Sequence, residues 1–276
     1  MSIDLVDFTA LARPIQDQGQ CGSCRAFGLT GVMEALYFQK YGKPIKLSER
    51  DLFFCSGGTC EQGLDMEGPL DYVQTHGIAT EKCCPYGDTI NGIDHSCGDG
   101  KCIEWWVDGV KIASWTKLNI QAEIDAAIRE GPVDMSMAVP QSFMNYAGGI
   151  YHSLGLFDSI IGYHAIGCFG KSFTEGWIEV RNSWGAQGWG EESISNHIPG
   201  EKGWFRAKAD DAALELEFYK VIINGPIPEP EPEPTPPPCP WSYAVVRLPG
   251  GKWFLRNYRK VRKLLLGIEP GVYSST

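Results

Sequence analysis

Hydrophobic and polar residues follow two periods along this chain, and they separate an early helical part from a later part rich in strands. Apolar residues at helical spacing predict helices over 24–41, 48–55, 66–77 and 119–131. Short apolar runs predict buried strands over 133–139, 164–170, 177–182, 203–207 and 217–223. Helices followed by strands in one chain favour an α+β fold.

The composition is that of a soluble globular protein, with 43% hydrophobic and 21% charged residues. No run of about eighteen apolar residues occurs, so no membrane-spanning helix is expected. Residues 1–14 lack the basic and apolar regions of a signal peptide.

The composition changes abruptly after Asn224. Residues 226–240 are rich in proline with alternating glutamate and predict an extended linker. Residues 241–276 carry a net charge of +6, and residues 1–240 carry −16. The sequence of this segment predicts a hairpin followed by a short basic helix. We therefore expect a domain at 1–225, a linker at 226–240 and a small basic segment at 241–276. This segment either docks on the acidic body, with Cys239 as a tether, or binds an acidic partner.

The string QDQGQCGSC ends at Cys24, where the first predicted helix begins. Backbone N–H groups and the dipole at a helix N-terminus stabilise a thiolate. Gly19 and Gly22 allow a tight turn upstream, and Gln18 places an amide donor where an oxyanion could form. Cys24 is therefore a candidate nucleophile, although a disulfide-bonded turn before an ordinary helix would give the same local pattern.

A nucleophile needs a base, and the base needs a group that orients it. Among the five histidines, only His164 lies in a strongly apolar run, where a histidine is more often a core residue. Asn182 ends the next predicted strand and precedes Ser183 and Trp184. An asparagine beside a histidine accepts the ring N–H and fixes its tautomer, and a tryptophan can shield that bond from water. Asn182 could equally start a turn.

With these motifs in this order, the sequence resembles the papain family of cysteine peptidases over residues 8–223. The resemblance rests on QGQCGSC at 18–24, SERDLFFC at 48–55, GGIY at 148–151, YHAIG at 163–167 and RNSWGAQGWGE at 181–191. It implies a two-lobe α+β fold of papain type, with a helical left lobe, a β-rich right lobe and the active-site cleft between them. Such enzymes are typically made as zymogens, so we expect that a signal and a propeptide have been removed.

The resemblance implies a role for each motif residue. Cys24 is the nucleophile, and His164 is the general base and then the acid. Asn182 orients His164, Gln18 and the backbone N–H of Cys24 form the oxyanion hole, and Trp184 covers the His–Asn bond. The implied substrate-binding positions are Gly63, Leu64, Asp65, Ser136 and Trp184. No cofactor and no metal is expected.

The chain departs from the family pattern at three places. A pocket with Asp65 and Ser136 would be more polar than the family's usual one. An insert at 192–202 predicts a surface loop. Arg25 stands where the family usually has an aromatic residue, typically tryptophan, packed between the lobes. A buried guanidinium needs a partner. We favour an ion pair between Arg25 and an acidic residue in the seam. Alternatively, Arg25 points into the cleft and binds an acidic substrate group, or it impairs the enzyme. In the first case Arg25→Trp should be tolerated or improve activity, because it restores the packing usual in the family.

Ten cysteines indicate an oxidising compartment. Cys24 should be a free thiol, and Cys168, in an apolar strand, a buried one. The resemblance implies disulfides Cys21–Cys60 and Cys55–Cys97. The cysteines left over are Cys83, Cys84, Cys102 and Cys239, and we expect one of the adjacent pair to bond to Cys102. A zinc site of His95, Cys97 and Cys102 would have poor spacing.

We therefore predict a thiol endopeptidase that hydrolyses peptide bonds through a Cys24 acyl-enzyme, in a secreted, periplasmic or lysosome-like compartment. Two alternatives stay open. The same triad could serve a transpeptidase or ligase, or Arg25 could mark an impaired peptidase that acts as a binding module. The expected partners are a peptide or protein substrate and a propeptide or protein inhibitor, and no nucleic acid is expected.

Overall fold

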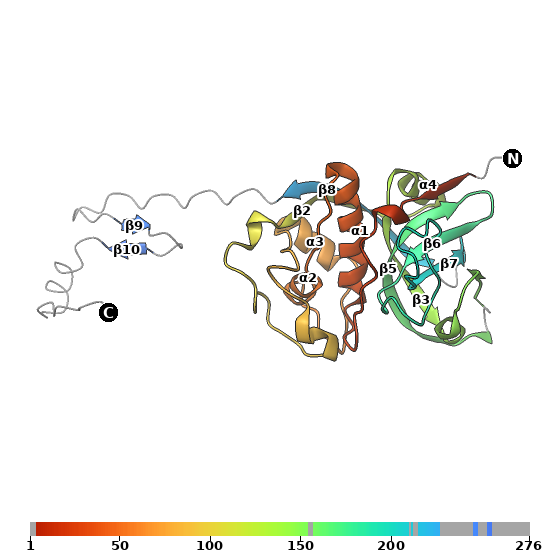
Figure 1. The fold of residues 1–276 in the computed structure, drawn as a ribbon, viewed down its shortest axis with the longest axis horizontal. Helices are drawn as coiled ribbons and strands as arrows, with labels where there is room; N and C mark the ends of the chain where they lie inside the picture. The colour runs from red at the N-terminus through yellow and green to blue at the C-terminus, as the bar shows by residue number, and fades with distance from the viewer. Residues whose placement is uncertain are drawn as a thin grey trace, which may run out of the picture. The chain divides into compact units, whose positions relative to one another are not determined.

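The computed structural model describes residues 4–153, 157–209, 211, 215–226, 245–247 and 253–255. The chain divides into two compact units, Met1–Glu229 and Pro230–Thr276. In the first unit, three helices gather on one side and most of the strands on the other (Figure 1). This is the two-lobe α+β arrangement that the sequence predicted.

The helices of the first unit lie where the hydrophobic periodicity predicts them. They are α1 (Cys24–Tyr41), α2 (Glu49–Cys55), α3 (Gly68–Thr75) and α4 (Gln121–Glu130). Helix α1 begins after Ser23 and ends at Gly42, whose φ of 65° is the left-handed conformation that glycine adopts readily. Residues 25–35 of α1 are all buried, so this helix forms the centre of the unit. Single 3₁₀ turns occupy Thr9–Leu11, Gly87–Asn91, Trp105–Val107 and Gln141–Asn145.

The strands of the first unit form one sheet in the order β2-β8-β3-β5-β6-β7-β4, and β1 pairs with β5. All of these pairings are antiparallel except that of β4 with β7. The strands run over β1 (Leu5–Asp7), β2 (Val110–Leu118), β3 (Val133–Pro140), β4 (Ile150–Tyr151), β5 (Ile160–Ser172), β6 (Trp177–Arg181), β7 (Trp204–Lys208) and β8 (Glu215–Pro226). The sequence predicted β3, β5, β6, β7 and β8, and missed the other three.

Strand β8 joins the two lobes. Its first residues pair with β3, and the rest of it pairs with β2, which contacts α3 in the helical lobe. Phe218 therefore belongs to the core of the β-rich lobe, whereas Tyr219, Val221 and Ile223 belong to the core of the helical lobe. A third apolar cluster, which includes Val32 of α1 and residues of β5 and β7, fills the seam.

Helix α1 and strand β5 approach each other closely because residue 28 is glycine. A Cβ atom at Gly28 would lie 2.9 Å from the backbone nitrogen of Ile166. Real carbon atoms do not approach a backbone nitrogen so closely, so a larger residue would push the helix and the strand apart. This contact lies one turn beyond Cys24 on the helix and two residues beyond His164 on the strand, and it therefore fixes the distance between them.

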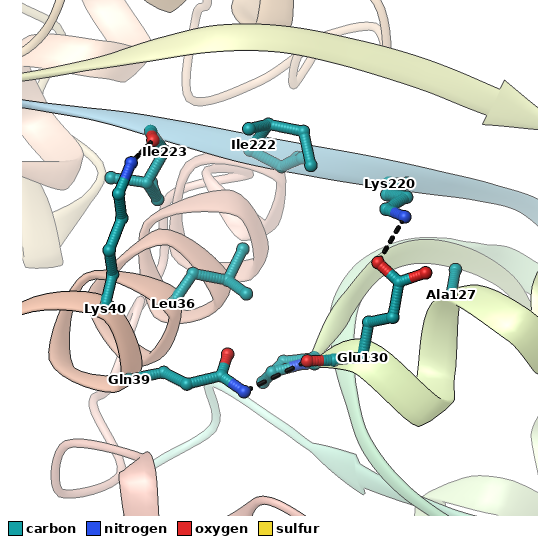
Figure 2. A pocket seen from close by; sticks show the side chains of 11 residues that line it. Leu36, Gln39, Lys40, Ala127, Glu130, Lys220, Ile222 and Ile223 are labelled. Carbon is teal, nitrogen blue, oxygen red and sulfur yellow. Dashed lines mark hydrogen bonds and ion pairs between the residues drawn. The ribbon is translucent and has the colours of Figure 1, made fainter.

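The far end of α1 holds the lobes together by polar contacts around a cavity of about 290 Å³, shown in Figure 2. Lys220 Nζ lies 2.6 Å from a carboxylate oxygen of Glu130, and Gln39 Nε2 donates to the Glu130 carbonyl at 3.0 Å. Lys40 Nζ donates to the Ile223 carbonyl at 2.7 Å. Helix α1, helix α4 and strand β8 meet here, about 20 Å along α1 from Cys24.

Three disulfides cross-link the helical lobe, and they confirm the predicted pairings. They are Cys21–Cys60, Cys55–Cys97 and Cys83–Cys102. The zinc site of His95, Cys97 and Cys102 is therefore not available, because Cys97 and Cys102 are in disulfides, and Cys84 and Cys168 are buried. Three disulfides indicate folding in an oxidising compartment. Within the described ranges, no helix has the length and hydrophobicity needed to cross a membrane.

The insert at 192–202 is a largely exposed loop, as predicted, but parts of it are anchored to the rest of the domain. Ser193 and Glu201 are buried. Glu201 accepts a hydrogen bond from the backbone N–H of Ile15 at 2.8 Å, and the N–H of Ile194 donates to Glu179 at 2.9 Å. These contacts join the insert to the N-terminal segment and to β6.

In the second unit, β9 (Val245–Arg247) and β10 (Trp253–Leu255) pair antiparallel, as expected for the predicted hairpin. The other predictions for this region lie outside the described residues. They concern the extended linker, the basic helix and the Cys239 tether.

Candidate active site

Cys24 is the first residue of α1 and lies half-buried on the floor of a cleft of about 630 Å³. The loop before it is held against the 60–63 segment by the Cys21–Cys60 disulfide and by a hydrogen bond from the Gly22 N–H to the Cys60 carbonyl at 2.8 Å. A Cβ atom at Gly22 would lie 2.8 Å from that same carbonyl oxygen, so only glycine fits here. This close contact places the thiol at the edge of the helical lobe.

His164 and Asn182 face Cys24 from the β-rich lobe. His164 lies on β5 and is buried, and its Nε2 lies 2.7 Å from Asn182 Oδ1. The same amide oxygen accepts the backbone N–H of Ser183 at 2.8 Å. Because a backbone N–H can only donate, this contact identifies the atom as the amide oxygen, so Nε2 of the histidine carries the proton. Nδ1 is then the ring nitrogen left to exchange a proton.

Trp184 packs beside the His–Asn pair. Its ring centre lies 5.0 Å from that of His164, with 31° between the ring planes. Phe143 and Trp189 support the indole at 6.0 Å and 4.8 Å. A half-buried indole at this place limits the access of water to the hydrogen bond between His164 and Asn182.

Gln18 comes from the segment before α1. Its Nε2 donates to the Cys21 carbonyl at 3.0 Å, and its Oε1 accepts from the Ser183 hydroxyl at 2.7 Å. A primary amide has two N–H groups, so a second one is available beside Cys24, and Gln18 lines the same cleft.

Two residues that the sequence did not single out hold this arrangement. Ser183 contacts both Gln18 and Asn182, and thereby ties the segment before the helix to the turn after β6. The Tyr86 hydroxyl donates to the Gln18 carbonyl at 2.8 Å and lies 2.7 Å from the Ser23 hydroxyl. Ser183 could have been noticed because it directly follows Asn182, whereas no sequence signal marks Tyr86.

The pKa of the Cys24 thiol lies below its ordinary value. Burial raises this pKa, but the hydrogen bond and the charge of His164 outweigh that effect. The backbone N–H groups of Ala165 and Arg25 also bond to the sulfur and favour the thiolate. The site can therefore hold a cysteine thiolate in contact with the His164 ring.

Residues 1–212 match the family model described as papain family cysteine protease. The chain belongs to the papain family. Similar relatives include cysteine proteinase 3 of Solanum lycopersicum, 34% identical over 194 residues (66% of this chain and 51% of the relative). The thiol protease aleurain of Arabidopsis thaliana is 31% identical over 201 residues, with the same coverage of each chain. The chain thus spans about half the length of these relatives.

A similar solved structure is that of the Carica candamarcensis cysteine protease CMS1MS2 in complex with E-64. It has a TM-score of 0.64 and 23% identity, covering 79% of this chain and 97% of that one. At this identity the likeness shows the papain-type fold alone. Cys24, His164 and Asn182 lie in three of the motifs on which the resemblance to the family rests, and they occur in the same order along the chain.

Arg25, which the sequence analysis singled out as a departure from the family pattern, lies in the seam between the lobes. The side chain is fully buried, and Nη1 lies 2.6 and 2.7 Å from the two carboxylate oxygens of Asp134 on β3. Nε and Nη2 both donate to the Met66 carbonyl. The acidic partner predicted for the seam is therefore present. The expectation that Arg25→Trp is tolerated is not supported, because that change would leave Asp134 buried without a counter-charge.

The positions expected to bind substrate divide into two groups. Gly63, Leu64 and Trp184 line the cleft that contains Cys24. Asp65 and Ser136 are not among the residues that line it. The Asp65 carboxylate accepts the backbone N–H groups of Glu67 and Gly68, at 3.0 and 2.6 Å, just before α3 begins. Ser136 is buried within β3. The more polar pocket expected from these two residues stays a prediction.

Proposed function

We propose that this papain-family protein is a thiol endopeptidase that cleaves peptide bonds through a Cys24 acyl-enzyme. The observation that carries the proposal is the lowered pKa of the Cys24 thiol beside His164, whose ring is fixed by Asn182 at 2.7 Å. A nucleophile, a base and an orienting group in contact are what acyl transfer requires.

In acylation, the Cys24 thiolate attacks the carbonyl carbon of the substrate and forms a tetrahedral intermediate. The oxyanion accepts hydrogen bonds from the free N–H of Gln18 and from the backbone N–H of Cys24, which has no acceptor within its helix. His164, protonated, then gives its Nδ1 proton to the leaving amine as the C–N bond breaks. The N-terminal part of the substrate remains attached to Cys24 as a thioester.

In deacylation, His164 takes a proton from a water molecule through the same Nδ1, and the water oxygen attacks the thioester carbonyl. Collapse of the second tetrahedral intermediate releases a carboxylic acid and restores the Cys24 thiolate. Asn182 holds the ring in one tautomer through both steps, and Trp184 shields that hydrogen bond. Gly63 and Leu64 would contact the acyl part of the substrate, because they form the wall of the cleft on the helical lobe.

The setting of the enzyme is part of the same proposal. Three disulfides favour a secreted, periplasmic or lysosome-like location. The peptidase domain would comprise residues 1–225, joined by the 226–240 linker to the basic segment at 241–276. A propeptide or a protein inhibitor would bind along the same cleft as the substrate, and the basic segment would dock on the acidic peptidase or bind another acidic partner.

The test compares wild-type protein with Cys24→Ala on an unstructured protein substrate. We expect hydrolysis by the wild type only, with the same circular dichroism spectrum for both proteins. Cys168→Ala, which changes a buried thiol away from the cleft, should retain activity and serves as the matched control. Added amine nucleophiles should leave the products mainly hydrolytic. Products joined to the amine would indicate a transpeptidase, and a wild type without turnover would indicate the binding module.

A further inference from the structure

One wall of the cleft exposes large apolar side chains, and it belongs to the β-rich lobe. Met144, Ile161 and Tyr163 are 43%, 50% and 75% exposed and line the cleft that contains Cys24. Among the described residues that line this cleft, Glu61 has the one permanently charged side chain, and it comes from the opposite lobe. We call Met144, Ile161 and Tyr163 the apolar wall. An apolar surface left open to water beside a reactive group indicates a place where a ligand is bound.

The backbone directs this wall toward the cleft. Val139 of β3 pairs with Gly162 of β5, and Pro140 pairs with Ile160, so Ile161 is the extra residue of a β-bulge. A bulge bends its strand and changes the direction in which its side chains point, and bulges often occur next to active sites. Ile161 therefore lines the cleft, whereas Ile160 does not.

The chemistry of the reaction decides which part of the substrate meets the apolar wall. His164 must reach the nitrogen of the leaving amine, so the residue after the scissile bond lies on the His164 side of Cys24. Tyr163 directly precedes His164 on β5, and Met144 follows Phe143, which contacts Trp184. The apolar wall thus flanks the leaving part of the substrate, while Gly63 and Leu64 flank the acyl part.

We propose that this enzyme selects substrates with an apolar side chain, aliphatic or aromatic, at the residue directly after the scissile bond, and that Met144, Ile161 and Tyr163 make that selection. Burial of apolar surface on both partners favours such a residue, and a flexible methionine can adapt to different shapes. A carboxylate packed against these side chains would lose bound water, which costs free energy. The inference rests on the proposed peptidase function, because it assigns a preference to that same site.

The test uses two peptides that differ only in the residue after the scissile bond, leucine in one and aspartate in the other. We expect wild-type kcat/KM to favour leucine by about tenfold. Ile161→Lys should reduce this ratio to about twofold or less. Ile160→Lys is the matched control, since it makes the same chemical change at the neighbouring isoleucine, which is 47% exposed and outside the cleft lining. It should keep the wild-type ratio.

A peptide methyl ester separates this inference from the proposed function, because its leaving group is methanol and places no side chain against the apolar wall. Wild type, Ile160→Lys and Ile161→Lys should all hydrolyse it at similar rates. A leucine-to-aspartate ratio near one in the wild type, or equal ratios in the two lysine variants, would overturn the inference while ester hydrolysis persists. Failure of the wild type to hydrolyse the ester would overturn the proposed function, and the inference with it.

Discussion

Replacing Arg25 with tryptophan, the residue that the resemblance to the family leads us to expect at this place, should destabilise this protein. The Arg25 guanidinium and the Asp134 carboxylate are both completely buried, with Nη1 2.6 and 2.7 Å from the two carboxylate oxygens. The same guanidinium donates twice to the Met66 carbonyl. Without Arg25, Asp134 is a buried carboxylate with no counter-charge, and the Met66 carbonyl loses both donors.

The magnitude follows from the burial of the pair. Removing one partner of a buried ion pair costs about 3–5 kcal/mol. Part of that cost is avoided because Asp134 can take up a proton, and burial raises the pKa of this carboxyl. We therefore expect a loss of about 3 kcal/mol for Arg25→Trp, which for a domain of this size lowers the melting temperature by about 10 °C.

Two further variants make this prediction specific. The double change Arg25→Trp with Asp134→Ser removes both charges and should recover most of the lost stability, since apolar or neutral replacements of buried pairs are often tolerated. Arg129→Met is the control, because it breaks an exposed ion pair with Asp4 and should change the melting temperature little.

The assay is thermal unfolding at pH 7 followed by circular dichroism, with peptide hydrolysis measured on the folded protein. If Arg25→Trp is as stable as the wild type, or if the double variant is no more stable than the single one, the buried pair does not stabilise the seam. Either result would refute the reasoning from Asp134.

Three other changes give further predictions. His164→Ala should raise the pH at which iodoacetamide alkylates Cys24 at half its maximal rate. In the wild type the hydrogen bond and the charge of His164 outweigh the effect of burial, which raises the thiol pKa. An unchanged half-maximal pH would contradict the proposed ion pair. Burial raises the pKa of Glu179 from 4.5 to about 8. Between these two pH values the folded state keeps a proton that the unfolded state releases. The stability of the wild type therefore falls as the pH rises from 4.5 to about 8. In urea unfolding, the stability of Glu179→Gln relative to the wild type should therefore increase from pH 5 to pH 8. Identical unfolding curves for the two proteins at both pH values would contradict this. Truncation after Gly225 should lower the melting temperature because the tail of +6 is attracted to residues 1–225, which carry −13; an unchanged value, with an intact tail released by proteolysis in the linker, would favour a partner-binding arm.

Features that depend on local sequence could be predicted. Helix α1 has a continuous apolar stretch and a glycine after its last turn, and strands β3, β5 and β6 are apolar runs buried along most of their length. Strand β2 was missed because its residues alternate only partly between buried and exposed, and several of them are polar. Its place in the sheet depends on β8, which lies far along the chain.

Features that depend on distant contacts could not be predicted. The partner of Arg25 lies 109 residues away, and no local pattern distinguishes Asp134 from other acids. Asp65 stands at a family pocket position, but its carboxylate accepts two backbone N–H groups before α3. A short side chain that can bond to nearby N–H groups does so when a helix begins beside it. Cys24, His164 and Asn182 could be placed in the fold because each lies within or next to a strongly patterned element, whereas their roles were implied by the resemblance to the family.

The central claim is that Cys24 forms an acyl-enzyme, and the most direct measurement traps that species. Wild-type protein is mixed with a peptide p-nitrophenyl ester, quenched with acid within milliseconds, and analysed by intact-mass spectrometry and peptide mapping. The account predicts a burst of one equivalent of p-nitrophenol and one acyl group on Cys24, with the buried thiols of Cys84 and Cys168 unmodified. An acyl group on another residue, or steady hydrolysis by Cys24→Ala, would contradict it.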